Sequence, residues 1–389
     1  MKRVFKNAKI VDVVACEVRE GAILVEDGVI AAVGDVVVPE DAEVVDLGGK
    51  TVMPGLFNTH VHMCFDAAPA PCYGKSICNT TIDAQSAFRK HLNSGVTFIR
   101  DLGGFQHVDI EIRNAARQGR ILAPDMQVSG MCISMTGGHG WQMACEVDGP
   151  DEARKAARKQ LKAGADWLKI MATGGVMTMG SEPGSPQLTE EEMRAAIEEA
   201  HKVGVKTSTH AQGMTGIKNV LRAGIDTIEH GFFMDDWCFD WMKEHDVYYV
   251  PTLSAVYWIC KMGTAAGIAA HMVKKAEDAF DAHRDTFLRA YKAGVKIALG
   301  TDAGTPLNKH DMSLYEMVLM RDAGMDVWDA LKGGTIIAAQ MCGVEKTHGS
   351  IEVGKRANLA VFAENPVEKL ETVMDCQMTV LGGEIVFQK

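Results

Sequence analysis

The sequence lacks three kinds of segment that would assign it early to a class of protein. No run of apolar residues approaches the roughly 20 that a membrane-spanning helix needs. The opening MKRVFKNAKIVDVV has Lys6 and Lys9 where a secretory signal needs an unbroken apolar core. The ten cysteines include no CxxC pair, the spacing typical of structural zinc sites and redox motifs. We therefore expect a cytoplasmic protein with reduced thiols.

Basic side chains are also scarce relative to acidic ones. The chain has 40 Lys and Arg against 51 Asp and Glu, a formal net charge of −11. An acidic surface argues against nucleic acid or an anionic membrane as a partner. Since 47% of the 389 residues are hydrophobic, there is ample material for a large core.

Both ends of the chain have sequence patterns typical of β-strands and turns. In the valine-rich residues 1–50, the run GAILVEDGVIAAVG has the turn signal EDG between two alternating segments, as in a hairpin. The C-terminal runs GSIEVGKRANLAVFAENP and QMTVLGGEIVFQ look alike. Because neither end has enough strands for a good sandwich, we predict that residues 1–50 and 345–389 pair into one small discontinuous β-sandwich domain.

Residues 51–344 alternate short apolar runs with longer helical patterns. Eight runs are candidate strands: 51–60, 95–101, 125–130, 166–172, 205–211, 226–231, 247–253 and 295–302. This alternation predicts an α/β fold of the (β/α)8 TIM-barrel type. An open doubly wound sheet stays possible, but it would favour a glycine-rich phosphate turn after the first strand, where NTHVHM stands instead.

The helical stretches carry their own start and stop signals. Thr189 is followed three residues later by Glu192, the pattern of a capping box. Gly204, Gly224 and Gly294 each stand just before a candidate strand, where a helix would end.

Side chains that bind metals stand at the ends of the candidate strands. Barrel enzymes build their sites at the C-terminal ends of their strands. Any one of these residues alone is readily explained as an ordinary hydrogen-bonded residue, but the set favours a metal site, because neutral imidazole and carboxylate are good ligands for Zn²⁺. The residues are His60 and His62 after strand 1, Lys169 in strand 4, His210 after strand 5, His230 after strand 6 and Asp302 after strand 8.

Lys169 is unusual because it stands between Leu168 and Ile170 in a run expected to be buried. A buried lysine is costly unless it is paired or neutral. A lysine with a lowered pKa can take up CO₂ and become a carbamate, an anionic ligand with two oxygens. Two metal ions that share a hydroxide need such a bridging ligand.

These residues resemble the amidohydrolase superfamily of metal-dependent hydrolases. The resemblance covers nearly the whole chain and rests on PGLFNTHVH, DWLKIMATGG, TSTHA, TIEHG and ALGTDAG. It is strongest to the imidazolonepropionase-related branch that includes Xaa-Pro and Xaa-Arg dipeptidases. The resemblance implies two divalent metal ions, with Zn²⁺ expected. His60, His62 and Asp302 would hold the more buried ion, His210 and His230 the second, and carboxylated Lys169 would bridge them.

The resemblance also implies a mechanism, in which a metal-bridging hydroxide attacks an amide carbonyl. Asp302 would accept the hydroxide proton and pass it to the leaving nitrogen. His139, in TGGHGW, is expected either to donate a hydrogen bond to the developing oxyanion or to be a loop residue held by glycines. Tyr257, beside Trp258, is a candidate substrate contact, with a place in the core or an interface as the alternative.

The expected function is therefore hydrolysis of an amide bond in Xaa-Pro-like or hydrophobic dipeptides or in N-acyl amino acids. The alternatives are a cyclic-amide, carbamate or urea hydrolase, or a non-catalytic scaffold relative. Deaminases of the superfamily usually lack the lysine that Lys169 would match. We expect a small-molecule substrate, no nucleic-acid or membrane partner, and a homo-oligomer.

Overall fold

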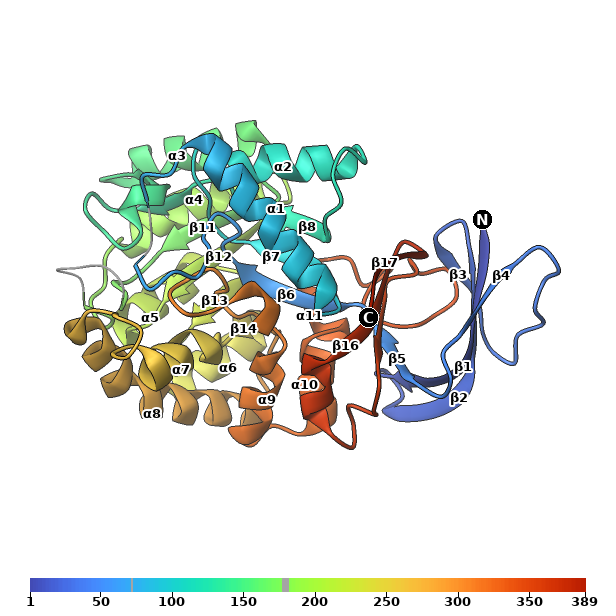
Figure 1. Ribbon diagram of the computed structural model, residues 1–389. Helices are drawn as coiled ribbons and strands as arrows, with labels where there is room; N and C mark the ends of the chain where they lie inside the picture. The colour runs from blue at the N-terminus through green and yellow to red at the C-terminus, as the bar shows by residue number, and fades with distance from the viewer. Residues whose placement is uncertain (71–72, 177–181) are drawn as a thin grey trace.

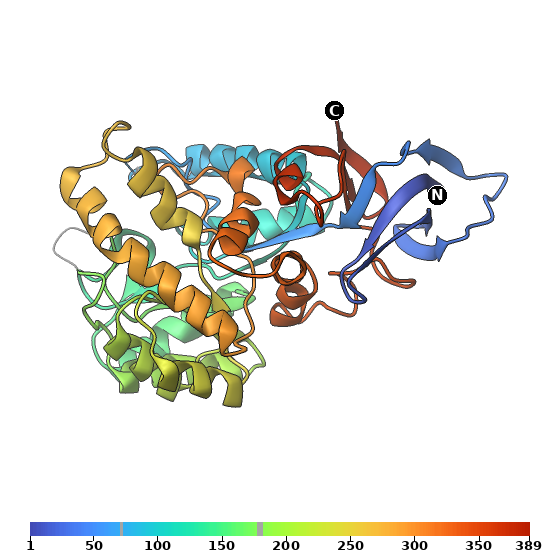
Figure 2. The same ribbon diagram turned by 90° about the horizontal axis from the view of Figure 1, so that it is seen from below.

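The computed structural model describes residues 1–70, 73–176 and 182–389. Figure 1 shows a barrel of strands surrounded by helices, with a separate β-sheet at one side that holds both chain termini. Figure 2 shows the long helix α8 (Ala270–Lys292) on the side of the barrel away from that sheet. No helix in the described ranges is long and apolar enough to cross a membrane.

The barrel strands pair in parallel, as the alternation of strands and helices predicts. They are β6 Leu56–Val61, β7 Val96–Asp101, β8 Asp125–Val128, β11 Trp167–Met171, β12 Lys206–Ala211, β13 Thr227–His230 and β14 Tyr248–Val250. Two short strands, β9 Cys132–Ser134 and β10 Ala144–Glu146, extend the sheet beside β11. The chain therefore has an α/β fold of the TIM-barrel type.

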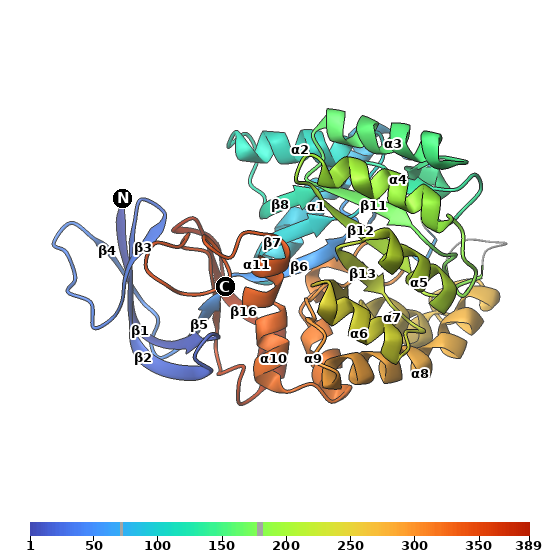
Figure 3. The same cartoon turned by 180° about the vertical axis from the view of Figure 1, so that it is seen from behind.

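Helices cover the outside of these strands, as Figure 3 shows from behind. They are α1 Ile77–Asn93, α2 Val108–Arg117, α3 Pro150–Ala163, α4 Glu190–His201, α5 Met214–Ala223, α6 Asp236–Glu244, α7 Leu253–Met262, α9 Tyr315–Asp322, α10 Val327–Gly333 and α11 Ile336–Met341. The capping box at Thr189 and Glu192 is confirmed, and Gly204, Gly224 and Gly294 all have positive φ angles after helices. Short 3₁₀ turns lie at Trp141–Met143, His310–Met312 and Leu370–Met374.

The predicted eighth strand, residues 295–302, is wrong as a regular strand, although the segment lies where that strand belongs. It joins its neighbours by single bridges, Ile297 to Tyr249 and Ala303 to Val61. Ala298 N donates to Tyr249 O at 3.0 Å, and Thr59 N donates to Leu299 O at 2.9 Å. An irregular segment thus closes the barrel between β14 and β6.

The predicted first strand, residues 51–60, is two strands in the structure. Its first part, β5 (Thr51–Pro54), lies outside the barrel, where it pairs with β15 (Leu359–Phe362) and β1 (Lys2–Asp12). Gly55 makes the break: a Cβ there would lie 2.2 Å from the Thr97 hydroxyl oxygen, so the chain passes too close for any other residue.

The two ends of the chain pair into one hydrogen-bonded sheet, in the order β17-β16-β15-β5-β1-β2-β3 with β4 beside β1. Its remaining strands are β2 Glu17–Glu26, β3 Val29–Gly34, β4 Glu43–Asp46, β16 Cys376–Leu381 and β17 Glu384–Gln388. Residues from both ends share its core, among them Ile10, Ile23, Leu359 and Val380. The EDG hairpin between β2 and β3 is confirmed. Sandwich packing and domain limits at residues 50 and 345 stay predictions.

Gly300 allows the closing segment to approach both neighbours. A Cβ there would lie 2.4 Å from Val250 Cγ1 and 2.8 Å from His60 Cβ. We expect Gly300→Ala to lower the free energy of unfolding by about 1–3 kcal/mol, because overpacking forces the strands apart. Urea unfolding measures this. The control is Gly74→Ala, at an exposed position where a Cβ meets nothing within 4 Å. Equal stability of the two variants would contradict the tight closure.

Candidate functional site

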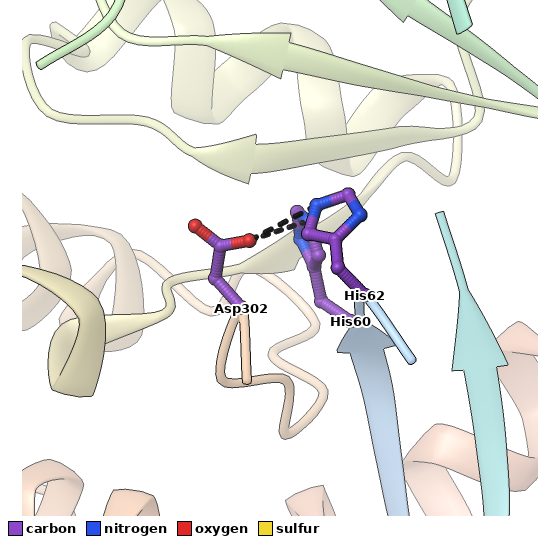
Figure 4. A group of neighbouring side chains, drawn as sticks. All are labelled: His60, His62 and Asp302. Carbon is purple, nitrogen blue, oxygen red and sulfur yellow. Dashed lines mark ion pairs between the residues drawn. The ribbon is translucent and has the colours of Figure 1, made fainter. Parts of the chain in front are cut away.

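His60, His62 and Asp302 form a compact cluster at the seam where the closing segment meets β6. Figure 4 shows the three side chains pointing toward one another. Asp302 Oδ1 lies 3.1 Å from His62 Nε2 and 3.4 Å from His60 Nε2. The possible ligand atoms all lie within 4.8 Å of one another, so the cluster can hold a metal ion.

The protonation of the two imidazoles follows from their other contacts. His62 Nδ1 lies 3.0 Å from Gly103 O, and a carbonyl oxygen only accepts, so Nδ1 carries the hydrogen. His60 Nδ1 likewise donates to Glu229 Oε2 at 2.8 Å. In a neutral ring, the Nε2 that faces Asp302 is then an acceptor. An acceptor facing a carboxylate at this distance needs a cation between them, either a proton or a metal ion.

The pKa values of the cluster agree with that requirement. Burial is the largest single effect on the pKa of His62 and lowers it, but the hydrogen bond to Asp302 and the charges of Asp302 and Asp101 together raise the pKa above its usual value. Burial and the nearby Lys169 charge hold the pKa of His60 well below its usual range. Burial would raise the pKa of Asp302, yet the two histidines lower it.

His210 and His230 lie beside this cluster, with ring centroids 4.5 Å apart. His210 Nε2 lies 3.1 Å from Gly174 O and must donate, which leaves Nδ1 as the acceptor. The Thr252 hydroxyl donates to Pro251 O at 2.6 Å, so His230 Nδ1 donates to Thr252 Oγ1, also at 2.6 Å. Burial, the largest cause, lowers the pKa of both rings well below the usual value. Each is therefore a neutral imidazole with one free acceptor nitrogen.

Lys169 lies on β11 with only 1% of its surface exposed. Its Nζ has no hydrogen-bond partner among the described residues. Burial lowers the pKa of the amine, against the opposing effect of Glu229 and Asp302. Because a buried amine without a partner is costly, its presence here calls for a ligand or a chemical change.

Two site residues have strained backbones. His230 and Asp302 adopt left-handed conformations, with φ angles of 72° and 63°. Non-glycine residues in this region cost of order 1–3 kcal/mol each and cluster at functional sites. Both side chains line the same cavity.

The structure brings the predicted ligands and His139 together but not Tyr257. One cavity is lined by His60, His62, His139, Lys169, His210, His230 and Asp302. The ring centroids of His139 and His210 lie 4.1 Å apart with the rings tilted by 34°, and burial lowers the pKa of His139 to about 4. Tyr257 instead lines a separate cavity between α7, α8 and α9, where its hydroxyl accepts a hydrogen bond from Lys261 at 2.7 Å. Its position does not support a contact with substrate.

The sequence reasoning missed a buried ion pair behind His60. Glu229 and Arg100 are both 0% exposed and 2.8 Å apart. Glu229 Oε1 also accepts from Ser208 and Thr227 hydroxyls, at 2.9 and 2.6 Å. A weaker signal was present, because both are charged residues that follow an isoleucine in a candidate strand. Glu229 fixes the ring of His60 and the nitrogen that carries its hydrogen.

Comparison with known proteins identifies the family. The amidohydrolase family matches residues 51–386. The chain belongs to this family. It is 30% identical over 358 residues to the ochratoxinase of Aspergillus niger, covering 83% of this chain and 72% of that protein. The crystal structure of a Xaa-Pro dipeptidase with bound methionine is 30% identical, with a TM-score of 0.92 over 100% of both chains.

A more distant relative is the imidazolonepropionase of Symbiobacterium thermophilum, 22% identical over 384 residues, which cover 88% of this chain and 84% of that protein. The resemblance to the amidohydrolase superfamily, with dipeptidase-like relatives, is thus confirmed. As an amidohydrolase, the protein is a hydrolase that acts on C–N bonds.

Replacing Glu229 with Gln removes the charged acceptor that orients His60. We expect the apparent affinity for Zn²⁺, measured by competition with a chelator, to fall about 10- to 100-fold. The matched control is Glu316→Gln, another buried carboxylate, which accepts from Leu253 N at 2.6 Å and Ser254 N at 2.8 Å away from the cluster. Both variants should lose stability, because in each an amide replaces a buried carboxyl group that accepts hydrogen bonds. Unchanged zinc affinity in Glu229→Gln would contradict the role of Glu229.

Proposed function

We propose that this amidohydrolase cleaves the amide bond of hydrophobic or Xaa-Pro-like dipeptides, or of N-acyl amino acids, with the help of two divalent metal ions. The observation that carries the metal dependence is the approach of two acceptors, Asp302 Oδ1 and His62 Nε2, at 3.1 Å. The partnerless amine of Lys169 beside them supports a second ion and a bridging ligand.

The acceptor atoms of the site fit this set of ions. His60 Nε2, His62 Nε2 and Asp302 would hold one ion, and His210 Nδ1 and His230 Nε2 the other. Lys169, as a carbamate, would bridge them, and nitrogen with carboxylate donors suits Zn²⁺. When bound, such ions lower the pKa of water and polarise a carbonyl.

The chain itself supplies the proton transfers. Asp302 has a lowered pKa and is therefore a carboxylate that can accept a proton from the attacking water. The same group can then deliver that proton to the leaving nitrogen. His139 has a pKa of about 4, so its ring is neutral at neutral pH and can donate one hydrogen bond to the carbonyl oxygen of the substrate.

The wall of the cavity supports an apolar substrate. Beyond the predicted ligands, it is lined by Phe65, Tyr73, Met143, Met171 and Pro306 among the described residues. The names of two relatives, a Xaa-Pro dipeptidase and an ochratoxinase, agree with amide substrates. Cyclic amides, carbamates and ureas are the competing substrate classes for the same site. A non-catalytic scaffold is disfavoured, because every predicted ligand position is filled.

A substrate panel tests the proposal directly. We expect zinc-loaded protein to contain about two metal ions per chain and to hydrolyse hydrophobic dipeptides or N-acyl amino acids in preference to charged ones. Removing the metal with a chelator should abolish turnover, and Zn²⁺ should restore it. Turnover only of cyclic amides, carbamates or ureas would overturn the substrate class. A loaded enzyme without any hydrolase activity, or a chain that binds no metal, would overturn the proposal.

Asp302→Asn tests the proton transfer. We expect kcat to fall by about 10²- to 10⁴-fold, because the amide cannot accept the proton. Metal content, measured by elemental analysis, should stay close to that of the unchanged protein, since the amide oxygen remains a possible ligand. The control is Asp311→Asn at an exposed position. Retained turnover in Asp302→Asn would rule out this role.

A further inference from the structure

The candidate site opens into a second cavity. This cavity shares His139, His210, His230, Asp302 and Thr305 with the one described above. The two cavities therefore lie on either side of the same group of histidines. An amide held at these histidines would place one of its substituents in each.

We call the wall of the second cavity the apolar lobe; it consists of Val176, Phe232, Ala255, Val256 and Ile259. Phe232 follows β13, whereas Ala255, Val256 and Ile259 come from α7. Phe232, Val256 and Ile259 are 1%, 3% and 5% exposed. Apart from the shared histidines and Asp302, no charged side chain lines this cavity in the described part of the chain.

One further polar side chain, that of Gln212, lines the second cavity beside the apolar lobe. Gln212 stands two residues after His210, lines the second cavity and is 4% exposed. Its backbone is held on both sides: Gln212 N donates to Thr173 Oγ1 at 3.0 Å, and Phe233 N donates to Gln212 O at 3.1 Å. Its amide oxygen, however, has no hydrogen-bond partner among the described residues.

A buried amide oxygen is normally paired, so one without a partner at a cavity wall indicates a donor supplied from outside. The apolar lobe around it suits an aliphatic or aromatic side chain. Together they describe one substituent of the substrate: an apolar side chain with an N–H group beside it.

We propose that the apolar lobe and Gln212 form the subsite that determines substrate specificity. It takes an aliphatic or aromatic side chain on one side of the scissile bond, and the Gln212 oxygen accepts a hydrogen bond from an N–H group on the same part of the substrate. The proposal rests on the proposed amide hydrolysis. The N–H group is either a free α-ammonium or an amide N–H.

Filling the lobe tests its role in specificity. Val256→Phe is expected to lower kcat/KM at least about tenfold for substrates with Leu or Phe on one side of the amide, and less than about threefold for Gly or Ala there. Phe232→Leu enlarges the lobe and should shift the preference of the enzyme toward substrates with bulkier side chains. This variant tests the same proposal if Val256→Phe fails to fold. An equal loss for all side chains, or unchanged selectivity, would overturn the proposal.

Gln212→Leu tests the hydrogen bond with a side chain of similar size. KM should rise about tenfold for substrates that carry the N–H group, with kcat changed much less. A dipeptide, its desamino analogue and its N-methylated amide identify the donor, because the analogue without the donor should be insensitive to the variant. Gln118→Leu, at an exposed position, is the matched control. A KM increase of the same size for every analogue would exclude this bond.

The failure of this inference can be told apart from that of the proposed function. If the unchanged enzyme hydrolyses no amide in the panel, the proposed function fails. If it does, and Val256→Phe and Gln212→Leu keep its selectivity and KM, the function stands and the apolar lobe is not the specificity subsite.

Discussion

The close approach of Asp302 to the Nε2 atoms of His60 and His62 is the constraint on which the rest of the site depends. Three acceptors would repel one another unless a cation lies among them. The protein nevertheless fixes them in place, because Gly103 O and Glu229 hold the opposite nitrogen of each ring. On the side of His60, Glu229 is itself held by a buried ion pair with Arg100.

The fold provides this arrangement through its irregular parts. The closing segment is not a regular strand, and Asp302 at its end has a left-handed backbone. Gly300 lets the segment lie against both β14 and β6. The irregular backbone of this segment ends in the Asp302 side chain of the cluster, and such local departures from regular structure are common at functional sites.

Much of this could be predicted from the sequence, because strand periods, helix caps and strand-end residues are local signals. Thr189, Gly224 and the histidines at strand ends are examples. The contact between His60 and Glu229 could not be predicted, because the two residues are 169 positions apart in the sequence and meet only through the arrangement of the strands. The break at Gly55 depends on Thr97, another distant residue. The cavity that Tyr257 lines could not be predicted either, because an aromatic residue on a helix looks the same in sequence whichever cavity it lines.

The position of Asp302 also joins the site to the topology of the chain. His60 belongs to the first barrel strand and Asp302 to the segment that takes the place of the last, so their cluster lies on the seam where the ring closes. A partly folded barrel would contain every strand-end histidine and still lack this cluster. A cation held by all three residues would bind only the closed ring, so its binding free energy would stabilise ring closure. The centre proposed for chemistry would then also act as the fastener of the barrel.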